Sequence, residues 1–302
     1  MGKIFNALNK AAESEAEDSA VEVPVMESAP PLKKREEKNE APPAAAEAAL
    51  APPAFRPQTV DLSSGNTGNW DERLVLSTAI TGAVAESIRT LRTRILHPYA
   101  GRVPRSLLIT SASPGEGKSF ICANLGVSLA QGVENHCLVV DCDLRRPSQH
   151  RLFGLSNKAG LSDYLQRKKK LPELLVPSGV DKLSILPGGP LSVNPAELLG
   201  SSTMPNLIDE LVQRYDDRII LLDSPPLHAA SETAILSRHV DGVILVVRYG
   251  VSRREHIKTL VETIGRDKIV GVVFNAYQAN LLDSKVFGYY DYQKDYYYPP
   301  QS

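Results

Sequence analysis

The segment Ala112–Ser119 constrains the fold of this chain more than any other stretch. It reads Ala-Ser-Pro-Gly-Glu-Gly-Lys-Ser, which fits a Walker A phosphate-binding loop with alanine in the first position. The apolar run Ser106–Ser111 precedes it and a helical pattern over Ser119–Gln131 follows it, and the motif requires this strand–loop–helix context. The Gly115–Ser119 amides then point into a concavity at the positive end of a helix, where phosphate oxygens bind. The segment therefore predicts a nucleotide-binding α/β domain.

The side chains of this loop suit ATP with Mg²⁺. Lys118 supplies a point charge for the β- and γ-phosphates, and the Ser119 hydroxyl is a ligand for Mg²⁺. The loop residues predicted to contact the nucleotide are Pro114, Gly115, Glu116, Gly117, Lys118 and Ser119.

Two further apolar runs end in carboxylates. Val139–Asp143 carries Asp141 and Asp143, and Ile219–Asp223 ends in Asp223. In a parallel sheet the carboxyl ends of the strands gather at the edge where the phosphate-binding loop lies. Asp223 is therefore predicted to hold Mg²⁺, directly or through water, as a Walker B carboxylate.

Asp141 and Asp143 form a second acidic pair. Because they lie two residues apart, both are expected on the same side of a strand. Such a pair exceeds what metal binding alone needs, so it is predicted to bind the metal and also to supply a base for an attacking hydroxyl. Either residue can be that base. In the alternative, Asp143 only caps the following turn.

Short apolar strands alternate with helices from Arg105 onward, which predicts a mostly parallel sheet with helices on both faces. This α/β domain is expected over residues 79–280, beginning with a helix at Ala79–Leu96. Further helices are predicted at Leu161–Leu165, Asn206–Tyr215, Ala230–Arg238 and Arg253–Gly265. Besides Ser106–Ser111, strands are predicted at His136–Cys142, Lys182–Pro187, Arg218–Asp223, Gly242–Arg248 and Lys268–Asn275.

The chain before the domain has a different composition. Residues 1–60 hold 8 of the 22 prolines, 14 alanines and a single glycine. Apolar residues other than alanine are too sparse there to offset the entropy of ordering, so residues 1–78 are predicted to be a disordered arm. Lys3–Ala11 carries a short apolar stripe of Ile4, Phe5 and Leu8. It is either a transient helix or a docking helix for a partner at a membrane surface.

The last 22 residues, 281–302, break the pattern again and are predicted to form a solvent-exposed tail. No alternation of apolar and polar residues would bury one face of a terminal strand. Six of the eleven tyrosines of the chain lie within ten positions of this tail: Tyr289, Tyr290, Tyr292, Tyr296, Tyr297 and Tyr298.

Composition excludes several classes of protein. The formal charge is −1, so no nucleic-acid partner is expected. No apolar run approaches the length of a membrane helix, and three cysteines do not make a disulfide framework. Cys137 and Cys142 lie five residues apart on one strand and so face opposite ways, which favours core packing over a metal site. The chain is expected to be soluble and cytoplasmic.

Three motifs together resemble one family. The loop Ser-Pro-Gly-Glu-Gly-Lys-Ser, the segment Val-Val-Asp-Cys-Asp-Leu-Arg-Arg-Pro and the segment Leu-Leu-Asp-Ser-Pro-Pro are similar to those of the bacterial tyrosine kinases of capsule and exopolysaccharide export. They occur in that family's order, and the tyrosine-rich tail is similar as well. The resemblance covers about residues 70–302. It implies a MinD/ParA-like P-loop fold, autophosphorylation of the tail tyrosines between subunits, and nucleotide contacts from Phe120 and Asn275.

The resemblance also implies partners. Glu86, Arg89 and Arg92 fit the E-x-x-R-x-x-R helix motif that mediates ring-like homo-oligomers in the family; without the resemblance they would be a solvated, salt-bridged face. Many members carry membrane segments on the same chain, and this sequence shows none. It is similar to the split type, in which a separate membrane protein, a chain-length or co-polymerase activator, recruits the kinase to the inner face of the membrane.

Two other functions compete with a tyrosine autokinase. One is a MinD/ParA-type ATPase switch that transfers no phosphate to protein. Such ATPases carry a second lysine early in the loop, where this chain has Ser113, and they lack a tyrosine cluster. The other is a nucleotide-bound scaffold without turnover, which would need a lost metal carboxylate. Both comparisons favour the kinase.

Overall fold

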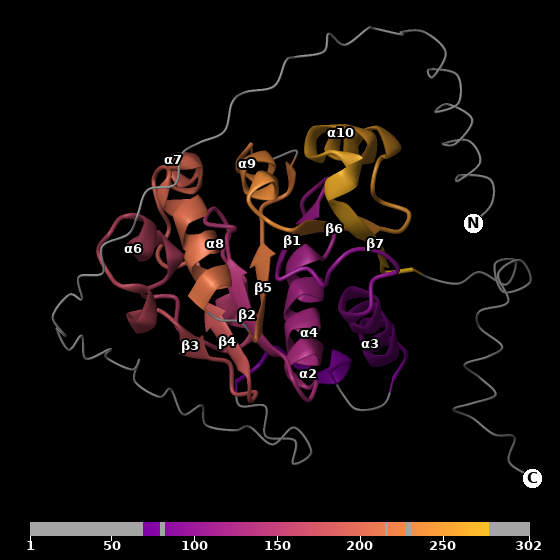
Figure 1. Ribbon diagram of the computed structural model, residues 1–302, viewed down its shortest axis with the longest axis horizontal. Helices are drawn as coiled ribbons and strands as arrows, with labels where there is room; N and C mark the ends of the chain where they lie inside the picture. The colour runs from indigo at the N-terminus through magenta and orange to yellow at the C-terminus, as the bar shows by residue number, and fades with distance from the viewer. Residues whose placement is uncertain (1–68, 79–81, 215–216, 228–230, 278–302) are drawn as a thin grey trace, which may run out of the picture. The chain divides into compact units, whose positions relative to one another are not determined.

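The computed structural model describes residues 69–78, 82–214, 217–227 and 231–277. The segment Lys3–Ala11, predicted to be either a transient helix or a docking helix, and the tail tyrosines lie outside these residues. Within them, strands and helices alternate along the chain, and the strands assemble side by side between two layers of helices (Figure 1).

The sheet has seven strands in the order β3-β4-β2-β5-β1-β6-β7. All neighbours pair in parallel except β3 and β4, which are antiparallel. This arrangement confirms the mostly parallel sheet that the alternating pattern predicts. The strands are β1 Ser106–Ser111, β2 His136–Asp141, β3 Val176–Pro177, β4 Leu183–Leu186, β5 Arg218–Asp223, β6 Gly242–Arg248 and β7 Ile269–Asn275.

Helices cover both faces of the sheet because the central strands are apolar on both sides. One buried cluster joins alternate strand residues to α2, α3, α4 and α5, and a second cluster joins the intervening residues to α6, α7, α8, α9 and α10. The α-helices are α2 Glu72–Ser77, α3 Ala83–Leu96, α4 Lys118–Ala130, α5 Gln149–Leu152, α6 Leu161–Leu165, α7 Pro195–Gly200, α8 Thr203–Arg214, α9 Glu232–Arg238 and α10 Arg254–Ile264. Two short 3-10 helices are η2 Leu171–Glu173 and η4 Arg266–Lys268.

The start of the folded region was predicted too late in the chain. Residues 69–78, assigned above to the disordered arm, pack as part of the domain: α2 lies there, Leu74 is fully buried, and Trp70 is 8% exposed. The Trp70 ring meets Phe153 edge to face at a centroid distance of 5.2 Å, and its Nε1–H donates to the Ser178 carbonyl at 3.0 Å. The local sequence does not predict this packing, because the partners of Trp70, which are Phe153 and Ser178, are distant in sequence.

Replacing Trp70 with alanine is expected to lower the free energy of unfolding by about 3 kcal/mol, since it removes a buried aromatic ring and leaves a cavity. Chemical denaturation of the two proteins measures the difference. Tyr99→Ala is the matched control, because the Tyr99 side chain is fully exposed. Equal stability of the Trp70→Ala protein and the wild type would contradict the packing of residues 69–78 onto the domain.

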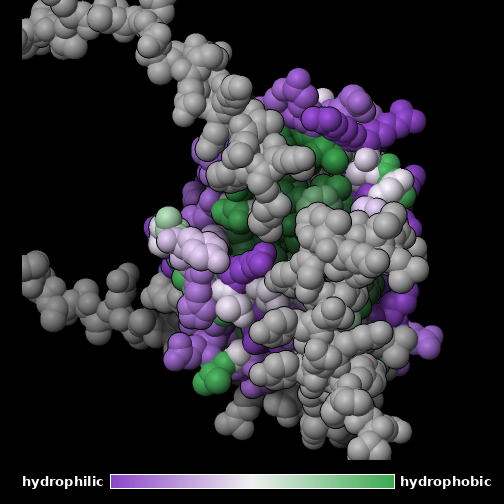
Figure 2. Space-filling view, turned by 90° about the vertical axis from the view of Figure 1, so that its right-hand side faces the viewer, coloured by the Kyte–Doolittle hydropathy of each residue, from purple (hydrophilic) through white to green (hydrophobic). Residues whose placement is uncertain are grey.

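The outer edge of the sheet is apolar. Along β7, alternate residues are exposed, and Val270, Val272 and Phe274 are about half or more exposed. Figure 2 looks onto this side of the molecule and shows apolar surface near the polar surface of α10. In the described residues, no helix is both long and apolar enough to cross a bilayer.

The three cysteines pack in the core, as their positions predict. Cys122 and Cys137 belong to one buried cluster and Cys142 to the other, so Cys137 and Cys142 do lie on opposite faces of the sheet. Burial raises the pKa of all three thiols, which keeps them protonated.

Candidate active site

The phosphate-binding loop runs from the end of β1 to the start of α4. Two glycines give it its curvature: Gly115 has φ 79° and Gly117 has φ 93°, both in the left-handed region that glycine adopts without strain. Gly117 also caps α4, and a Cβ there would collide with the Asn275 side chain. The loop therefore presents its backbone closely and without side chains, as a phosphate cradle requires.

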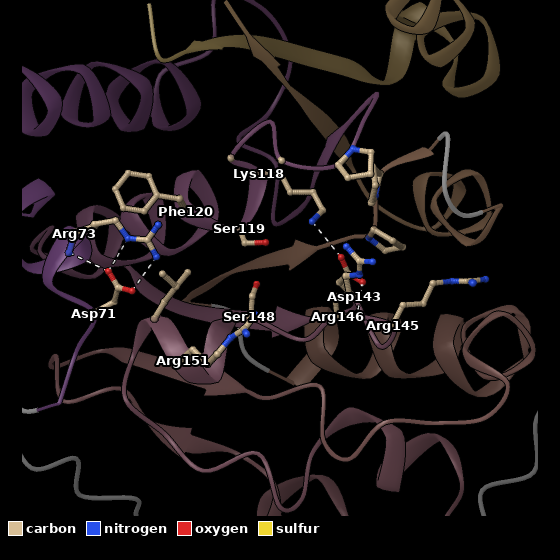
Figure 3. A pocket seen from close by; sticks show the side chains of 16 residues that line it. Asp71, Arg73, Lys118, Ser119, Phe120, Asp143, Arg145, Arg146, Ser148 and Arg151 are labelled. Atoms are coloured by element: carbon tan, nitrogen blue, oxygen red, sulfur yellow. Dashed lines mark hydrogen bonds and ion pairs between the residues drawn. The ribbon is translucent and has the colours of Figure 1, made fainter. Parts of the chain in front are cut away.

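A cavity of about 780 Å³ opens in front of this loop (Figure 3). Its volume is in the range of small-molecule sites. Residues from the loop, from the segment after β2 and from the segment after β5 surround it, together with the beginning of the folded region. The lining residues are Asp71, Arg73, Pro114, Gly115, Gly117, Lys118, Ser119, Phe120, Asp143, Arg145, Arg146, Ser148, Arg151, Leu152, Pro225 and Pro226.

Lys118 reaches across the cavity to a carboxylate. Its Nζ lies 3.1 Å from Oδ2 of Asp143, and the side chain of Lys118 is 13% exposed. Burial alone would lower the pKa of Lys118, but the charges of Asp223, Asp143 and Asp141 outweigh it and raise this pKa. The lysine is thus a fixed positive charge at the position where phosphate oxygens are expected.

Asp223 ends β5 beside the loop, as the sequence predicts for a metal carboxylate. Its Oδ2 accepts a hydrogen bond of 2.8 Å from Nε2 of Gln149. Its Oδ1 is buried and has no hydrogen-bond partner among the residues that the structure describes. Burial raises the pKa of Asp223, against the opposing effect of Lys118. A buried carboxylate oxygen that lacks a hydrogen-bond partner is a suitable ligand for a cation.

Asp141 ends β2 and lies deeper than the cavity. It is fully buried, its Oδ2 accepts the amides of Ser148 at 2.8 Å and Gln149 at 2.9 Å, and its Oδ1 accepts the amide of Asp143 at 3.3 Å. Burial and the neighbouring Asp223 raise the pKa of Asp141 to about 8, although these amides oppose the shift. Asp141 therefore holds the backbone that carries Asp143.

Asp143 lines the cavity and also caps the turn that follows. Its Oδ2 faces Lys118, while its Oδ1 accepts the amide of Arg146 at 3.1 Å. The two interpretations that the sequence leaves open, turn cap and active-site carboxylate, are thus compatible in geometry. The same-side prediction assumed that both aspartates lie on a strand, but β2 ends at Asp141, so Asp143 belongs to the segment that follows.

Glu116 fixes the shape of the loop from behind. It is 1% exposed; its Oε2 accepts the amide of Ala112 at 3.0 Å and its Oε1 accepts the hydroxyl of Ser252 at 2.5 Å. Arg248 donates to the Gly115 carbonyl at 3.1 Å, and Asn275 donates to the Glu116 carbonyl at 2.9 Å. The segments after β6 and at the end of β7 therefore hold the loop in place.

Replacing Glu116 with alanine is expected to weaken nucleotide binding roughly tenfold, because the Ala112 amide loses its buried acceptor and the loop loses its tie to Ser252. Titration calorimetry with ADP measures the effect. Glu116→Gln is the control, since its one carbonyl oxygen can still accept from Ala112 and a smaller loss is expected. Equal ADP affinity of the alanine variant and the wild type would contradict this role.

Comparison with known proteins identifies the family. A family model described as the CobQ/CobB/MinD/ParA nucleotide binding domain matches residues 107–292. The tyrosine-protein kinase YwqD of Bacillus subtilis is 35% identical over 228 residues, which cover 74% of this chain and 94% of YwqD. The chain belongs to the bacterial tyrosine kinases.

Other members of this kinase family differ in length. The tyrosine-protein kinase wzc of Salmonella typhimurium is 32% identical over 215 residues, and the chain spans only 30% of its length. Among solved structures, the chimerical protein CapA2B2 has a TM-score of 0.63 at 31% identity, covering 70% of this chain and 92% of that chain. The kinase fold is thus shared over most of the described residues.

The structure places some of the remaining predicted site residues of the kinase and does not describe others. Phe120 lines the cavity, and Asn275 contacts the loop backbone. On α3, Glu86 and Arg89 form an ion pair of 2.7 Å, while Arg92 donates to the Ser128 carbonyl at 2.8 Å. The six tail tyrosines lie outside the described residues, so their role stays a prediction, as does the oligomer interface.

Several residues at the site escaped the sequence analysis. Gln149 bridges Asp223 and the Ser119 carbonyl, and Glu232 is a buried carboxylate paired with Arg145 at 2.9 Å. No local pattern marks either residue. By contrast, the pair Arg145-Arg146 directly after Leu144 is a visible signal in the sequence, and both arginines line the cavity, as does Arg151.

Proposed function

We propose that this chain is an ATP-dependent protein-tyrosine kinase. It transfers the γ-phosphate of ATP to C-terminal tyrosines of a neighbouring copy and thereby regulates capsule or exopolysaccharide synthesis and export. One arrangement carries the proposal: Asp143 lies beside Lys118 in a cavity that a substrate hydroxyl can enter. Hydrolysis of a nucleotide alone does not require this second carboxylate or the six tyrosines near the C-terminus.

The cofactors of the proposal are ATP and Mg²⁺. The residues fit Mg²⁺, because the Asp223 carboxylate is buried and the Ser119 hydroxyl, which lines the cavity, lies within hydrogen-bonding reach of it. Ser119 and Asp223 would hold the ion, and Asp143 would bind it through water. Asp141 is the less favoured ligand in this proposal, since it lies behind the cavity and both of its oxygens already accept backbone amides. The bound ion would neutralise charge on the phosphates.

Asp143 is the better candidate for the base. A general base must come within hydrogen-bond reach of the hydroxyl that it deprotonates. Asp143 lines the cavity, whereas Asp141 is fully buried behind it. In the proposed reaction Asp143 orients the tyrosine hydroxyl and accepts its proton, and Lys118 stabilises the charge that develops on the transferred phosphoryl group.

The proposed partner in the reaction is a second copy of the chain. Residues 281–302 span up to roughly 70 Å when fully extended, so a tail can reach the site of a neighbour. The helix α3, with Glu86, Arg89 and Arg92, is the proposed interface of a ring-like assembly. A separate membrane protein is the proposed activator, as the resemblance of this chain to the split members of the kinase family implies.

Phosphorylation is expected to dissolve this assembly. Each phosphotyrosine adds about −1.5 to −2 charges, so six add roughly −9 to −12 per chain and repel one another beside the active-site carboxylates. Light scattering should therefore report an oligomer before phosphorylation, with the activator present, and monomers afterwards. An unchanged mass after complete phosphorylation would reject the charge-driven release.

The competing function is an ATPase switch without protein phosphorylation, which the match to the MinD/ParA family model favours. Against it, the position of the second loop lysine is Ser113, whose hydroxyl hydrogen-bonds Nδ1 of His256 at 3.2 Å. The intact mass of the purified protein after incubation with ATP and Mg²⁺ separates the two functions. Gains in steps of one phosphate support the kinase, and loss of ATP without a gain in mass supports the switch.

A further inference from the structure

The cavity is larger than the phosphate-binding loop alone requires. Figure 3 shows that it continues from Lys118 and Asp143 past Ser119 to Phe120, Asp71 and Arg73. The loop amides and Lys118 already supply the phosphate contacts. The rest of the cavity is therefore available to a second ligand or to another part of the same one.

The cations of this cavity are not equivalent. Arg73 is held by Asp71 at 2.9 Å, Lys118 by Asp143 at 3.1 Å and Arg145 by the buried Glu232 at 2.9 Å. Arg146 and Arg151 also line the cavity and are exposed, but neither side chain forms an ion pair or hydrogen bond with any residue that the structure describes. Two guanidinium groups thus face the cavity without an anion.

An unused donor lies between these two arginines. The Ser148 hydroxyl is buried and has no hydrogen-bond partner among the described residues, and Figure 3 shows Ser148 between Ser119 and Arg151. Buried hydroxyls without a partner are uncommon in folded proteins. We call these three residues, Arg146, Ser148 and Arg151, the Arg-Ser-Arg cluster. Its donors have no partner in the described part of the chain, and they suit an anion.

The tail of this chain carries anions at suitable places. Asp291 and Asp295 are interspersed among its tyrosines. In an extended peptide, residues two positions apart lie on the same side at a separation of about 7 Å. Asp291 then shares a side with Tyr289, and Asp295 shares a side with Tyr297. A carboxylate on the tail can therefore contact an arginine while a tyrosine hydroxyl reaches the phosphate-binding loop.

We propose that the Arg-Ser-Arg cluster is the acceptor-recognition site, which binds the tail carboxylates next to the tyrosines and selects acidic tyrosine segments as substrates. This inference rests on the proposed function. Arginine suits this role because its planar group pairs with a carboxylate through two hydrogen bonds. Arg146 and Arg151 are positioning residues: they place the acceptor and do not touch the reacting phosphoryl group.

A transfer assay with full-length chains tests the proposal. The donor has all six tail tyrosines replaced by phenylalanine, so it cannot accept phosphate, and the acceptor carries Lys118→Met, so it cannot transfer it. Arg146→Ala and Arg151→Ala are introduced singly into the donor. Each is expected to raise the KM for the acceptor roughly tenfold, with little change in kcat and with unchanged affinity for ADP. Arg238→Ala, at an exposed arginine outside the cavity, is the control.

Charge reversal gives a second and more specific measurement. An acceptor with Asp291→Lys and Asp295→Lys should be a poor substrate of the wild-type donor, and a donor with Arg146→Glu and Arg151→Glu should restore part of the transfer. Lys294→Ala in the acceptor should have little effect. Recovery would not follow if the arginines only supported the fold.

Three results would overturn the proposal. Unchanged KM in both arginine variants would show that the tail binds elsewhere. A loss of ADP affinity as large as the loss of transfer would assign the arginines to the nucleotide. If a fluorescein-labelled peptide of residues 281–302 does not bind the donor, the tail is not the ligand of this site, whether or not transfer is observed. If instead the wild-type donor transfers nothing while the peptide still binds through the arginines, the proposed kinase function fails and the recognition site stands.

Discussion

A chain carrying Lys118→Met is expected to lose tyrosine phosphorylation by roughly 10³-fold, because it loses the charge that stabilises the transferred phosphoryl group. The fold should survive, since Lys118 faces the cavity and pairs there with Asp143, which lines the same cavity. Intact-mass measurement after incubation with ATP and Mg²⁺ gives the rate. Thermal unfolding of the same sample shows whether the variant is folded.

The matched control for this experiment is Lys168→Met. Lys168 is an exposed lysine that lies outside the cavity, so the substitution makes the same chemical change at a remote position. Phosphorylation should continue at the wild-type rate in this variant. If the Lys118→Met chain also phosphorylates itself at the wild-type rate, the assignment of the whole site is wrong.

The parts of this fold that the sequence predicts well are those with a strong local pattern. The bounds of β1, β5 and β6 agree with the apolar runs, because each run is buried on both faces and ends at a polar or turn residue. The phosphate-binding loop is equally local, since its residue types and spacing alone produce the cradle. Parallel pairing then brings Asp223 to the loop, as the strand order requires.

The parts that it misses depend on distant contacts. Helix α2 follows an arm rich in proline and alanine. Trp70 is buried because it packs against Phe153 and donates to the Ser178 carbonyl, and both residues are distant in sequence. Strand β3 has two residues and carries no periodicity at all. The sequence could not separate the roles of Asp141 and Asp143 for a similar reason. The depth of each residue depends on where β2 ends and on the segment that folds over it, and neither is visible in the local pattern.

The different depth of these two aspartates leads to the second large effect. Asp143→Asn is expected to lower kcat for tail phosphorylation by roughly 10² to 10⁴, since it removes the proposed base. Affinity for nucleotide should change much less, because the loop amides and Lys118 remain. Single-turnover kinetics with the phenylalanine-tailed donor and the Lys118→Met acceptor separate the two quantities. Equal losses of ADP affinity and rate would contradict the catalytic role of Asp143.

Asp141→Asn is the comparison that makes this prediction specific, because its main effect should be on stability. Asp141 accepts three backbone amides, and its pKa of about 8 lies far above the ordinary value of 3.8. A carboxyl group with a raised pKa holds its proton more tightly in the folded state than in the unfolded state. Its contribution to stability is therefore present below about pH 4 and is lost as the pH rises toward 8.

The unfolding midpoint of the nucleotide-free protein should accordingly fall between pH 5 and 8 more steeply in the wild type than in Asp141→Asn. Asp143→Asn should keep the wild-type slope, because its carboxylate is paired with Lys118 and open to the cavity. Thermal unfolding across this pH range measures all three slopes. If Asp141→Asn keeps the wild-type slope and instead abolishes transfer without loss of stability, the catalytic carboxylate is Asp141, although it is more deeply buried than Asp143.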